Sequence, residues 1–521
     1  MKNKLTYKAG NKVIEREINY IPLRYIIAGV ITILEIISII GIVVLLCYFV
    51  PYFYIAAYIT AFACELKIIS SDNNPDYKIP WMLFVLIIPI AGFMLYFMFS
   101  SRKLKKKYVN KLADLNRQSY NYDDSCVLNE LSSIDDVSYS QVTMLCKIAD
   151  THIFKDTNLT YFPSGEEYFV NLLADLKKAK EFIFMEYFII EEGLFWNSIL
   201  EVLKQKVKDG LEVKVVYDDI GCMSTLPGNY SKILKSFGID AVPFSRLKGS
   251  ADSEFNNRSH RKITIIDGNI GYTGGINIAD EYINRIVKFG HWKDVGIKLE
   301  GEGVKELTKL FVIDYGINVK GSIKIDQKYY QTNTKFNSDG YVIPFGDGPK
   351  PLYERRVGKS VIQNMFNAAT KYAYVTTPYL IIDNDLCVSI ENAALRGVDV
   401  RIIVPHIPDK KVVFGMTRSF YKRLIDAGVK IYEYEPGFIH AKTYLVDDKY
   451  AMVGTINLDY RSLVHHFENG VWIYKSDVIK DIKVDIEDTL SKSIFISKDN
   501  LKTNLINRFI RAIVRIFAPM L

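Results

Sequence analysis

The sequence has few of the residues from which disulfide frameworks and thiolate metal sites are built. Six cysteines are scattered over 521 residues, and no two of them stand at C-x-x-C spacing. This scatter argues against a disulfide framework and against a thiolate zinc site, and it fits a reducing compartment. A cluster of Asp and Glu residues of the kind that binds magnesium is also missing. We therefore expect neither a metal ion nor a cofactor.

Histidine is also scarce, and its distribution is informative. Two of the seven histidines head a pattern, H-x-K-x4-D, that occurs at 260–267 and again at 440–447. In each copy an asparagine follows ten residues after the aspartate, at Asn277 and Asn457, behind a pair of small residues. A single copy would be weak support for a functional site, because a His and a Lys on the surface are common. Two copies with the same extension, inside a repeated unit, indicate a functional site.

Charge and hydropathy narrow the class of partner. The net charge of +7 suits an anionic partner, such as a phospholipid surface or a nucleic acid, but it does not choose between them. The apolar residues that raise the hydrophobic fraction to 49% lie mostly before residue 100. We expect no cleavable signal peptide there, because the apolar region is too long and lacks a small-residue cleavage site after a short core.

Three apolar stretches near the amino terminus, at 25–50, 52–69 and 79–99, are each close to the length that crosses about 30 Å of hydrocarbon as a helix. The basic cluster at 102–107 predicts that everything downstream is cytoplasmic. Three crossings would then place the amino terminus outside, yet that terminus also carries several Lys and Arg residues. Three crossings, or two crossings and an interfacial segment, therefore both remain open.

From about residue 150 the pattern becomes α/β and is then repeated. Apolar strand-like runs at 181–190 and 213–217 enclose a helical stretch, and the same order of elements returns around 371–404. The two pattern histidines are 180 residues apart, and the neighbouring elements keep a similar offset. We infer a duplicated α/β unit covering about 155–325 and 340–490. Each copy is expected to hold a mixed, largely parallel sheet flanked by helices, and the copies to be related by a pseudo-twofold axis.

The predicted organisation has five parts. The last stretch of the chain, 504–521, places three arginines at helical spacing among apolar residues. Such a helix suits an anionic membrane interface, although a terminal helix docked on the protein is the alternative. The parts are a membrane anchor with two or three hydrophobic helices (1–108), a polar helical connector (109–150), a first α/β half (151–325), a second α/β half (326–495) and an amphipathic basic C-terminal helix (496–521).

The repeated pattern suits the chemistry of a phosphodiester. Residues i and i+2 on a strand point to the same face, so His260 projects with Lys262 and His440 with Lys442. Pseudo-twofold packing of the two strands would bring two imidazoles and two ammonium groups into one pocket. One histidine can attack phosphorus and form a phosphohistidine, while the other protonates the departing alcohol and deprotonates the incoming one. The lysines neutralise the non-bridging oxygens as charge grows on them.

A neutral nucleophilic histidine also needs a partner that fixes its tautomer. Candidates lie at a similar distance downstream of each pattern, at Asp294 and Glu468. Asn277 and Asn457 could add amide donors for the phosphate oxygens. The two patterns are too similar for the residues alone to indicate which histidine is the nucleophile.

These residues resemble the phospholipase D superfamily and, within it, the bacterial cardiolipin synthases. The stretch N-N-R before the first pattern and the stretch N-L-D-Y-R-S after the second are similar to the synthases. Gly275 stands where a Ser is common, whereas Thr455 keeps a hydroxyl in the second copy. The resemblance implies duplicated phospholipase D-like α/β units behind N-terminal transmembrane helices. It implies the catalytic residues His260, Lys262, Asp267, His440, Lys442 and Asp447, and the phosphate-binding residues Asn277, Asn457 and Thr455.

The resemblance also implies the reaction. Phosphatidyl is transferred from one phosphatidylglycerol to a hydroxyl of another, giving cardiolipin and glycerol by a ping-pong mechanism in which His260 is the favoured nucleophile. We expect a multi-pass protein of the bacterial cell membrane with a cytoplasmic catalytic domain. Its expected partners are phosphatidylglycerol and cardiolipin in an anionic membrane, and not nucleic acid. The oligomeric state stays open.

Three other functions remain as alternatives. Phospholipase D-type hydrolysis, or transfer that uses another phospholipid such as phosphatidylethanolamine, would employ the same machinery. A nucleic-acid phosphodiesterase of the same superfamily fits the basic charge but not the membrane helices. A non-enzymatic membrane scaffold would tolerate a change of His260 or His440, whereas the enzyme would lose nearly all turnover.

Overall fold

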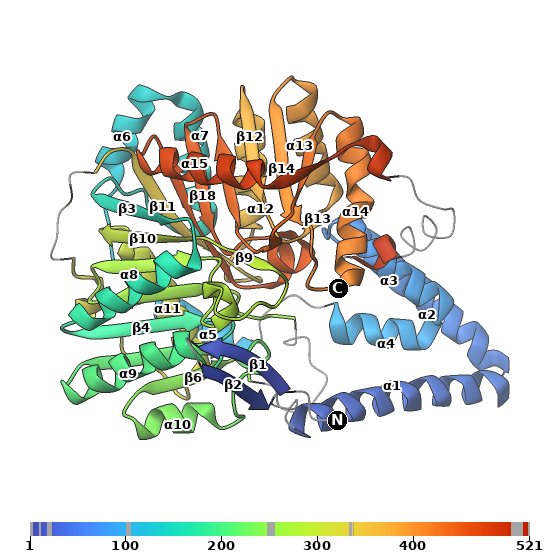
Figure 1. The fold of residues 1–521 in the computed structure, drawn as a ribbon. Coiled ribbons are helices and arrows are strands. Elements are labelled where there is room, and N and C mark those ends of the chain that lie inside the picture. The colour runs from blue at the N-terminus through green and yellow to red at the C-terminus, as the bar shows by residue number, and fades with distance from the viewer. Residues whose placement is uncertain are drawn as a thin grey trace.

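Two similar α/β halves form the body of the protein, one above the other in the view of Figure 1, and a group of apolar helices projects to one side. This computed structural model describes residues 4–9, 12–17, 23–49, 51–100, 106–246, 256–332, 336, 338–501 and 514–518. Each half contains one large sheet with helices on both faces. The predicted duplication is therefore present in the fold.

The first half is built on a seven-stranded sheet in which β7 occupies the centre. Strand β7 carries the first copy of the pattern and lies between β8 and β4. All of its residues are buried. In sheet order the strands are β3 (Thr157–Phe162), β10 (Gly296–Gly301), β8 (Ile270–Gly274), β7 (Lys262–Ile266), β4 (Phe182–Tyr187), β5 (Glu212–Asp218) and β6 (Asp240–Phe244).

The second half repeats this order and adds one strand at an edge. Strand β17 takes the place of β7, between β18 and β12. The agreement of strand order is what the expected pseudo-twofold relation requires. In sheet order the strands are β11 (Tyr341–Asp347), β20 (Glu468–Tyr474), β18 (Tyr450–Gly454), β17 (Thr443–Val446), β12 (Tyr372–Thr376), β14 (Asp399–Pro405), β15 (Lys430–Tyr434) and β21 (Ser493–Ile496).

Both sheets are mixed, but they are not largely parallel, and this corrects the expectation from strand–helix alternation. Only β4, β5 and β6, and likewise β12, β14 and β15, run parallel to their neighbours in these groups. The other pairings between described strands of the two sheets are antiparallel. The reason is that β7 and β17 are followed by tight hairpin turns instead of crossover helices, and such turns join antiparallel strands.

Helices α11 and α15 lie between the two sheets and join the halves. Helix α11 contacts β6 and β7 and also β11 of the second half, while α15 contacts β17 and also β3 of the first half. One apolar cluster accordingly contains residues of both sheets, among them Ile263 and Leu445. The helices of the two halves are α8 (Gly165–Lys178), α9 (Leu194–Lys208), α10 (Tyr230–Ser236), α11 (Val304–Asn318), α12 (Val357–Ala368), α13 (Asn384–Leu395), α14 (Lys411–Asp426) and α15 (Val478–Ser491).

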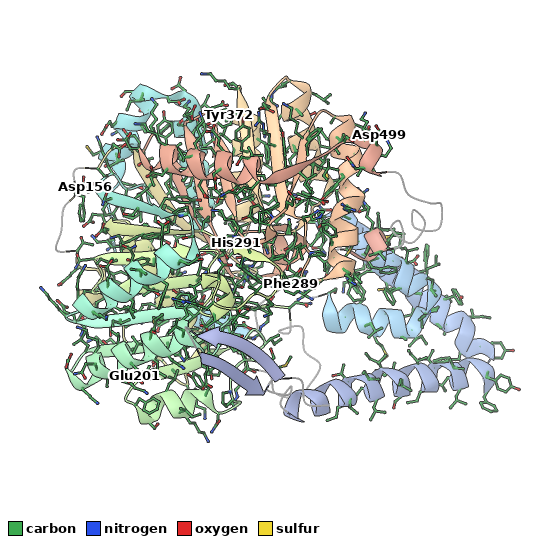
Figure 2. All side chains as sticks on the ribbon, viewed as in Figure 1. Asp156, Glu201, Phe289, His291, Tyr372 and Asp499 are labelled. Atoms are coloured by element: carbon green, nitrogen blue, oxygen red, sulfur yellow. The ribbon has the colours of Figure 1, made fainter. Side chains whose placement is uncertain are left out.

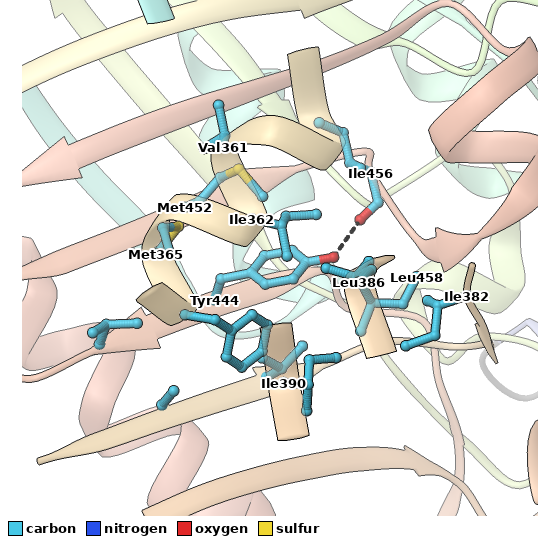
Figure 3. Packing of buried hydrophobic residues seen from close by; sticks show 14 of the residues in the cluster. Val361, Ile362, Met365, Ile382, Leu386, Ile390, Tyr444, Met452, Ile456 and Leu458 are labelled. Atoms are coloured by element: carbon cyan, nitrogen blue, oxygen red, sulfur yellow. Dashed lines mark hydrogen bonds between the residues drawn. The ribbon is translucent and has the colours of Figure 1, made fainter. Parts of the chain in front are cut away.

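The core behind β17 holds the second pattern strand in place. Tyr444 lies in an apolar cluster with Ile362 of α12 and Leu386 of α13 (Figure 3). Its hydroxyl donates a hydrogen bond to the backbone carbonyl oxygen of Ile456 over 3.1 Å. A buried tyrosine needs such a partner for its hydroxyl, so the ring has one favoured position in the core. This packing fixes the strand that follows the second H-x-K.

Short backbone contacts join the halves beside the pattern histidines. Strand β9 (His291–Lys293) of the first half pairs in parallel with β16 (Gly437–Ile439) of the second. His291 accordingly lies near the boundary between the halves in Figure 2. The backbone N–H groups of His260 and His440 each donate to a carbonyl oxygen of the other half, over 2.8 and 2.7 Å. Each histidine is thus held against the half to which it does not belong.

Four apolar helices precede the two halves. The segment Gly29–Leu46 of the first of them has a mean hydropathy of 2.8, and none of it is buried. Among the described residues, it is the one helix found to be long and apolar enough to cross a membrane. The helices are α1 (Leu23–Phe49), α2 (Pro51–Ser70), α3 (Pro75–Ile87) and α4 (Pro89–Phe99).

The third apolar stretch does not form a single helix, which corrects the expectation of one near-spanning segment at 79–99. It is divided at Ile88 into α3 and α4. These helices are about 20 and 17 Å long, well short of a hydrocarbon core of roughly 30 Å. Pro89 has no N–H to continue the ladder of α3. At Gly92 a Cβ would lie 2.4 Å from the carbonyl oxygen of Phe84, so only glycine allows this close hairpin, which packs against α2.

The segments outside the halves pack on them. The connector is helical, as expected, with α5 against α11 and α7 against α12. Of the predicted C-terminal helix at 496–521, the structure describes 496–501 and 514–518. Ile496 still belongs to β21 and residues 498–501 form a short 3-10 helix, so the predicted helix does not begin at 496. In 514–518 the guanidinium group of Arg515 lies 4.4 Å from the ring centre of Phe420 in α14, and the ring of Phe517 lies 5.7 Å from that of Phe84 in α3. These contacts favour the docked alternative for that part, while 502–513 and 519–521 lie outside the described residues. Further elements are β1 (Lys4–Ala9), β2 (Lys12–Glu17), α5 (Lys106–Arg117), α6 (Ser125–Ile134), α7 (Asp136–Ala149), β13 (Leu380–Ile381) and β19 (Leu458–Asp459).

Candidate active site

The two pattern histidines lie in one buried region between the halves. Each stands just before its central strand, and 6% of His260 and 8% of His440 is exposed. Lys262 and Lys442, two residues further on, are almost completely buried. After burial, Lys442 contributes to lowering the pKa of Lys262, and Lys262 contributes to lowering that of His440, so the two H-x-K pairs lie close to each other, as the duplication predicts.

Glu468 holds His260. The Nδ1 atom of His260 lies 3.0 Å from both carboxylate oxygens of Glu468, the first residue of β20. Burial lowers the pKa of His260 to about 3, against the opposing effect of Glu468. Burial acts to raise the pKa of Glu468, but its contacts with His260 and His466 outweigh burial and hold that pKa below its usual range. An ionised carboxylate accepts a hydrogen bond from Nδ1–H, which leaves the lone pair of Nε2 free.

Asp294 holds His440. The Nδ1 atom of His440 lies 2.6 Å from Oδ2 of Asp294, and Nζ of Lys442 lies 2.8 Å from the same nitrogen. Burial, followed by Lys442 and Lys262, lowers the pKa of His440 well below its usual value. Burial raises the pKa of Asp294 to about 7, although Lys442 acts against it. The acid of this pair therefore binds a proton near neutral pH.

Each histidine is held by the acid of the other half. The sequence predicts Asp294 and Glu468 as the partners, and the structure brings both acids into contact with a histidine. The pairing is crosswise, because Asp294 belongs to the first half and pairs with His440, while Glu468 belongs to the second half and pairs with His260. Among the described residues, neither half alone contains both a pattern histidine and the acid that holds it.

The two lysines lie in the same buried region and affect each other. Nζ of Lys262 donates to the carbonyl oxygen of His260 over 2.6 Å, and Nζ of Lys442 donates to that of His440. Burial, with Lys442 as the next cause, lowers the pKa of Lys262 to about 7. Burial lowers the pKa of Lys442 to about 8, although Asp294 acts in the opposite direction. An anion in this pocket would raise both values and keep both lysines charged.

The two aspartates of the pattern lie at the far ends of their strands, which corrects their predicted place in the catalytic set. Asp267 and Asp447 have φ values of 53° and 55° in the hairpin turns after β7 and β17. Asp267 accepts three backbone N–H bonds from 180–182 over 2.8 to 3.0 Å, and Asp447 three from 370–372 over 2.7 to 2.9 Å. Hairpin turns with positive φ favour Asp at this position. We therefore assign both aspartates the role of fixing the central strands.

The predicted phosphate-binding asparagines are engaged with protein groups. Asn277 accepts from the N–H of Ile189 over 3.0 Å and donates to the hydroxyl of Tyr282 over 2.6 Å. Asn457 donates to Oδ2 of Asp459 over 3.0 Å, and its Oδ1 is buried without a hydrogen-bond partner among the described residues. Each Nδ2 group retains a second hydrogen, so phosphate binding by these two residues stays a prediction.

Thr455 supports Glu468, which corrects the phosphate-binding role predicted for its hydroxyl. Its Oγ1 donates to Oε2 of Glu468 and accepts from the N–H of Asn469 over 3.0 Å. The equivalent position in the first half is Gly275, where a Cβ would lie 2.0 Å from Oδ1 of Asp294. A side chain therefore has no room beside Asp294. The departure from the family pattern at Gly275 follows from the acid that it faces.

The structure adds two residues that the sequence pattern does not single out. Ser462, in the N-L-D-Y-R-S stretch, donates from Oγ to Oε1 of Glu468 over 2.5 Å. The ring of His466 lies 5.6 Å from that of His260, and its Nδ1 lies 3.7 Å from the same oxygen of Glu468. The sequence contains one signal for His466, its spacing from Glu468. A residue two positions before an acid on a strand tends to face the same side as that acid.

This arrangement provides the groups that exchange at a phosphodiester requires. One neutral imidazole has a free lone pair, a second imidazole shares its environment with an acid that titrates near neutral pH, and two ammonium groups face the same space. Nucleophilic attack, proton transfer and stabilisation of anionic oxygens are thus all available in one place. Burial strengthens the electrostatic part of each of these interactions.

Comparisons with known proteins identify the family to which the chain belongs. The family model described as cardiolipin synthase, PLD-like domain, matches residues 172–287 and 362–490, and the model described as phospholipase D-nuclease N-terminal matches 36–100. The chain is 33% identical to cardiolipin synthase 2 of Bacillus anthracis, over 89% of this chain and 90% of that protein. It is 32% identical to the cardiolipin synthase of Halalkalibacterium halodurans, over 83% of this chain and 87% of that protein.

A solved structure shows the same fold at low sequence identity. The phosphatidylserine synthase of Haemophilus influenzae Rd KW20 aligns with a TM-score of 0.55 and 15% identity, over 73% of this chain and 98% of that one. The duplicated α/β body is therefore an architecture that the two proteins share. Together with the matches to both halves and to the amino-terminal segment, the relatives establish that the chain belongs to the cardiolipin synthase family of phospholipase D-like proteins.

Proposed function

We propose that this protein is a cardiolipin synthase, a phosphatidyltransferase that converts two phosphatidylglycerol molecules into cardiolipin and glycerol. The observation that carries the proposal is the crossed pairing of His260 with Glu468 and of His440 with Asp294 in one pocket. Membership of the family and the apolar helix α1 support a lipid substrate at a membrane.

In the first step, Nε2 of His260 attacks the phosphorus of phosphatidylglycerol. The N–P bond forms as the P–O bond to the headgroup glycerol breaks, and His440 delivers a proton to that oxygen. Glu468 accepts the hydrogen bond from Nδ1–H and stabilises the positive charge that develops on the ring. Lys262 and Lys442 stabilise the non-bridging oxygens as their negative charge grows.

In the second step, a hydroxyl of another phosphatidylglycerol attacks the phosphorus of the phosphohistidine. His440 takes the proton of that hydroxyl while the N–P bond breaks, so cardiolipin leaves and His260 returns to its neutral form. Asp294, whose pKa burial raises to about 7, shares the proton with His440. The pair can therefore hold and release one proton near neutral pH, which general acid–base catalysis requires.

The test uses purified protein in phosphatidylglycerol vesicles without added metal. We expect cardiolipin and glycerol in equal amounts, together with a phosphohistidine that mass spectrometry locates at His260. A folded protein that forms neither product would overturn the proposal. Phosphatidic acid as the main product, or incorporation of labelled phosphatidylethanolamine, would instead assign the alternative hydrolase or transferase activity.

The polar loop between α2 and α3 supports a specific arrangement in the membrane. Asn74 donates to Oδ2 of Asp383 over 2.9 Å. Asp76 accepts from the N–H of Asn384 over 2.8 Å and from the hydroxyl of Tyr460 over 3.1 Å. Because the loop docks on the second half, the end of α2 and the start of α3 belong on the same side of the membrane as that half.

We infer two crossings, by α1 and α2, followed by a re-entrant hairpin of α3 and α4. Among the described residues α1 alone meets the test of length and apolar composition, but the 20 residues of α2 span about 30 Å, which is long enough to return across the hydrocarbon core. Both basic segments, at the amino terminus and after residue 100, then lie on the cytoplasmic side with the catalytic body, which removes the conflict between them. In a cysteine-free background, a cysteine at Tyr52 should react with an impermeant reagent added to intact cells, and one at Asp72 should not. The opposite labelling pattern would contradict this topology.

A further inference from the structure

We propose that the pocket contains a binding site for a zinc-class divalent cation, formed by His260, His466 and Glu468, at which the ion inhibits the enzyme. One possible ligand atom from each of the three side chains lies within 4.8 Å of the other two. Two imidazoles and one carboxylate are a ligand set that zinc accepts, with a fourth position left for water or an anion. His466 has no step in the transfer reaction, so this site extends the proposed function.

The spacing suits tetrahedral coordination. Bonds of about 2.0–2.1 Å at tetrahedral angles separate neighbouring ligand atoms by roughly 3.3 Å. Nδ1 of His260 and Oε1 of Glu468 are 3.0 Å apart, and Nδ1 of His466 is 3.7 Å from the same oxygen. Shifts of a few tenths of an ångström therefore satisfy both spacings. The remaining distance, between the ligand nitrogens of the two histidines, is at most 4.8 Å.

An unsatisfied nitrogen points independently to a missing ligand. Nδ1 of His466 is buried, and no hydrogen bond reaches it within the part of the chain that the structure describes. The residue as a whole is 9% exposed. A buried polar atom without a partner destabilises the fold, and a cation supplies that partner.

The other two ligands are already prepared for coordination. The hydroxyls of Thr455 and Ser462 donate to the two oxygens of Glu468 and hold the carboxylate in place, while each oxygen keeps a further lone pair. His260 is already held beside this carboxylate, with its Nδ1 atom 3.0 Å from both oxygens of Glu468.

The same geometry explains why the ion inhibits. An ion bound at Nδ1 of His260 requires the lone pair of that nitrogen, so the ring proton moves from Nδ1 to Nε2. Nε2 then has no lone pair with which to attack phosphorus. The ion also takes the carboxylate of Glu468 that supports the nucleophile. Inhibition is therefore reversible and ends when a chelator removes the ion.

Calorimetric titration of Zn²⁺ into the purified full-length protein tests the site directly. The variants are His466→Asn and, as a matched control, His406→Asn. His406 also contacts a carboxylate, that of Glu433 over 2.9 Å, but its side chain is 43% exposed and it is not one of the three residues of the candidate ion site. We expect one tight site in the native protein and in His406→Asn, weakened at least about tenfold in His466→Asn.

The activity measurement rests on the proposed function. Zn²⁺ should suppress cardiolipin formation, and EDTA should restore it. In His466→Asn, the Zn²⁺ concentration that halves the rate should rise by about the same factor by which the Zn²⁺ affinity falls. The rate of each protein is compared with its own rate without metal. Equal Zn²⁺ affinity with and without His466, or no tight site in the native protein, would overturn the proposal. His466→Gln repeats the comparison where Asn prevents folding. Because calorimetry needs no turnover, its result is independent of the proposed reaction.

Discussion

The two halves of the active site have the same plan but unlike acids. Glu468 receives hydrogen bonds from the hydroxyls of Thr455 and Ser462, whereas Asp294 faces Gly275, where no side chain fits. The pKa of Glu468 lies below its usual range in spite of burial, because its imidazole contacts outweigh burial. Burial raises the pKa of Asp294 to about 7. One carboxyl group is thus held as an anion, and the other is ready to bind a proton.

This difference teaches how a duplicated fold can divide one reaction into two roles. A nucleophilic imidazole must be neutral with its proton at Nδ1, and an anionic Glu468 ensures this for His260. An acid–base pair must gain and lose a proton near the working pH, and the His440–Asp294 pair meets that requirement. The comparison supports His260 as the nucleophile, the same residue that the resemblance favours.

The strongest way to break the comparison is to remove each histidine in turn. We expect His260→Asn and His440→Asn each to lower turnover by roughly 10,000-fold or more, because residues of one catalytic unit act together. The variants should differ with a phosphatidyl analogue that carries a nitrophenol leaving group, which needs no acid. His440→Asn should still release nitrophenol and form a phosphohistidine, and His260→Asn should do neither. Covalent label at residue 440 would reverse the two roles.

Replacing the acids should produce the next largest effects. Glu468→Gln should lower kcat by roughly 1,000-fold, because an amide does not stabilise the developing imidazolium charge as a carboxylate does.

Asp294→Asn should change the pH profile instead. The native rate should fall above pH 7, where both the His440–Asp294 pair and Lys262, with pKa values near 7, lose protons. In a plot of log kcat/KM against pH, the loss of two protons makes the alkaline side of the native profile steep. Asp294→Asn removes one of the two titrating groups and should halve that slope. An unchanged slope would show that Asp294 does not titrate in the reaction.

Exchanging the residues beside the acids should have intermediate effects. Thr455→Val removes one hydrogen bond to a charged acceptor, worth about 1.5–3 kcal/mol, and should lower kcat by roughly 10- to 100-fold. Loss of that donor raises the pKa of Glu468, so the acidic limb of the rate profile should move to higher pH.

In the other half, Gly275→Ala should lower the stability of the protein, because the added Cβ atom would lie 2.0 Å from Oδ1 of Asp294. Overpacking of this kind costs about 1–3 kcal/mol, which thermal unfolding would detect as a lower Tm. A stable Gly275→Ala protein with native activity would show that the two halves tolerate the same side chain.

The smallest effect should come from the contact between the apolar amino-terminal helices and the residues around the active site. Asp76→Ala removes the hydrogen bonds to Asn384 and Tyr460, the latter only two residues before Ser462. We expect about a two- to fivefold lower rate on vesicles, because the two lost bonds to a carboxylate, worth about 1.5–3 kcal/mol each, position Asn384 and Tyr460 and do not touch the catalytic groups. Asp72→Ala, an exposed position of the same loop, is the control and should leave the rate unchanged. Equal rates for both variants would show that the contact of this loop with the second half has no effect on the reaction rate.

Local signals in the sequence account for what could be predicted. The two H-x-K patterns, the repeated succession of strands and helices along the chain and the acids Asp294 and Glu468 all follow from spacing and periodicity. Two errors also had local signals. The Asp267-Gly268 pair is a hairpin-turn signal, which indicates an antiparallel strand pair and a structural aspartate. Pro89 inside the third apolar stretch indicates a break in the helix.

The sequence by itself determined the chemistry, because two copies of a His–Lys pair behind an apolar helix suit phosphate transfer at a membrane whatever their arrangement. Only the tertiary structure decided the pairing, since His260 and Glu468 are 208 residues apart and His440 and Asp294 are 146 apart. Such contacts depend on how the halves pack, and no local propensity encodes them. The same packing decided that Thr455 donates a hydrogen bond to Glu468, while Gly275 leaves space for Asp294. The space beside a buried carboxylate depends on how the side chains of the folded core pack, and a local stretch of sequence does not specify it.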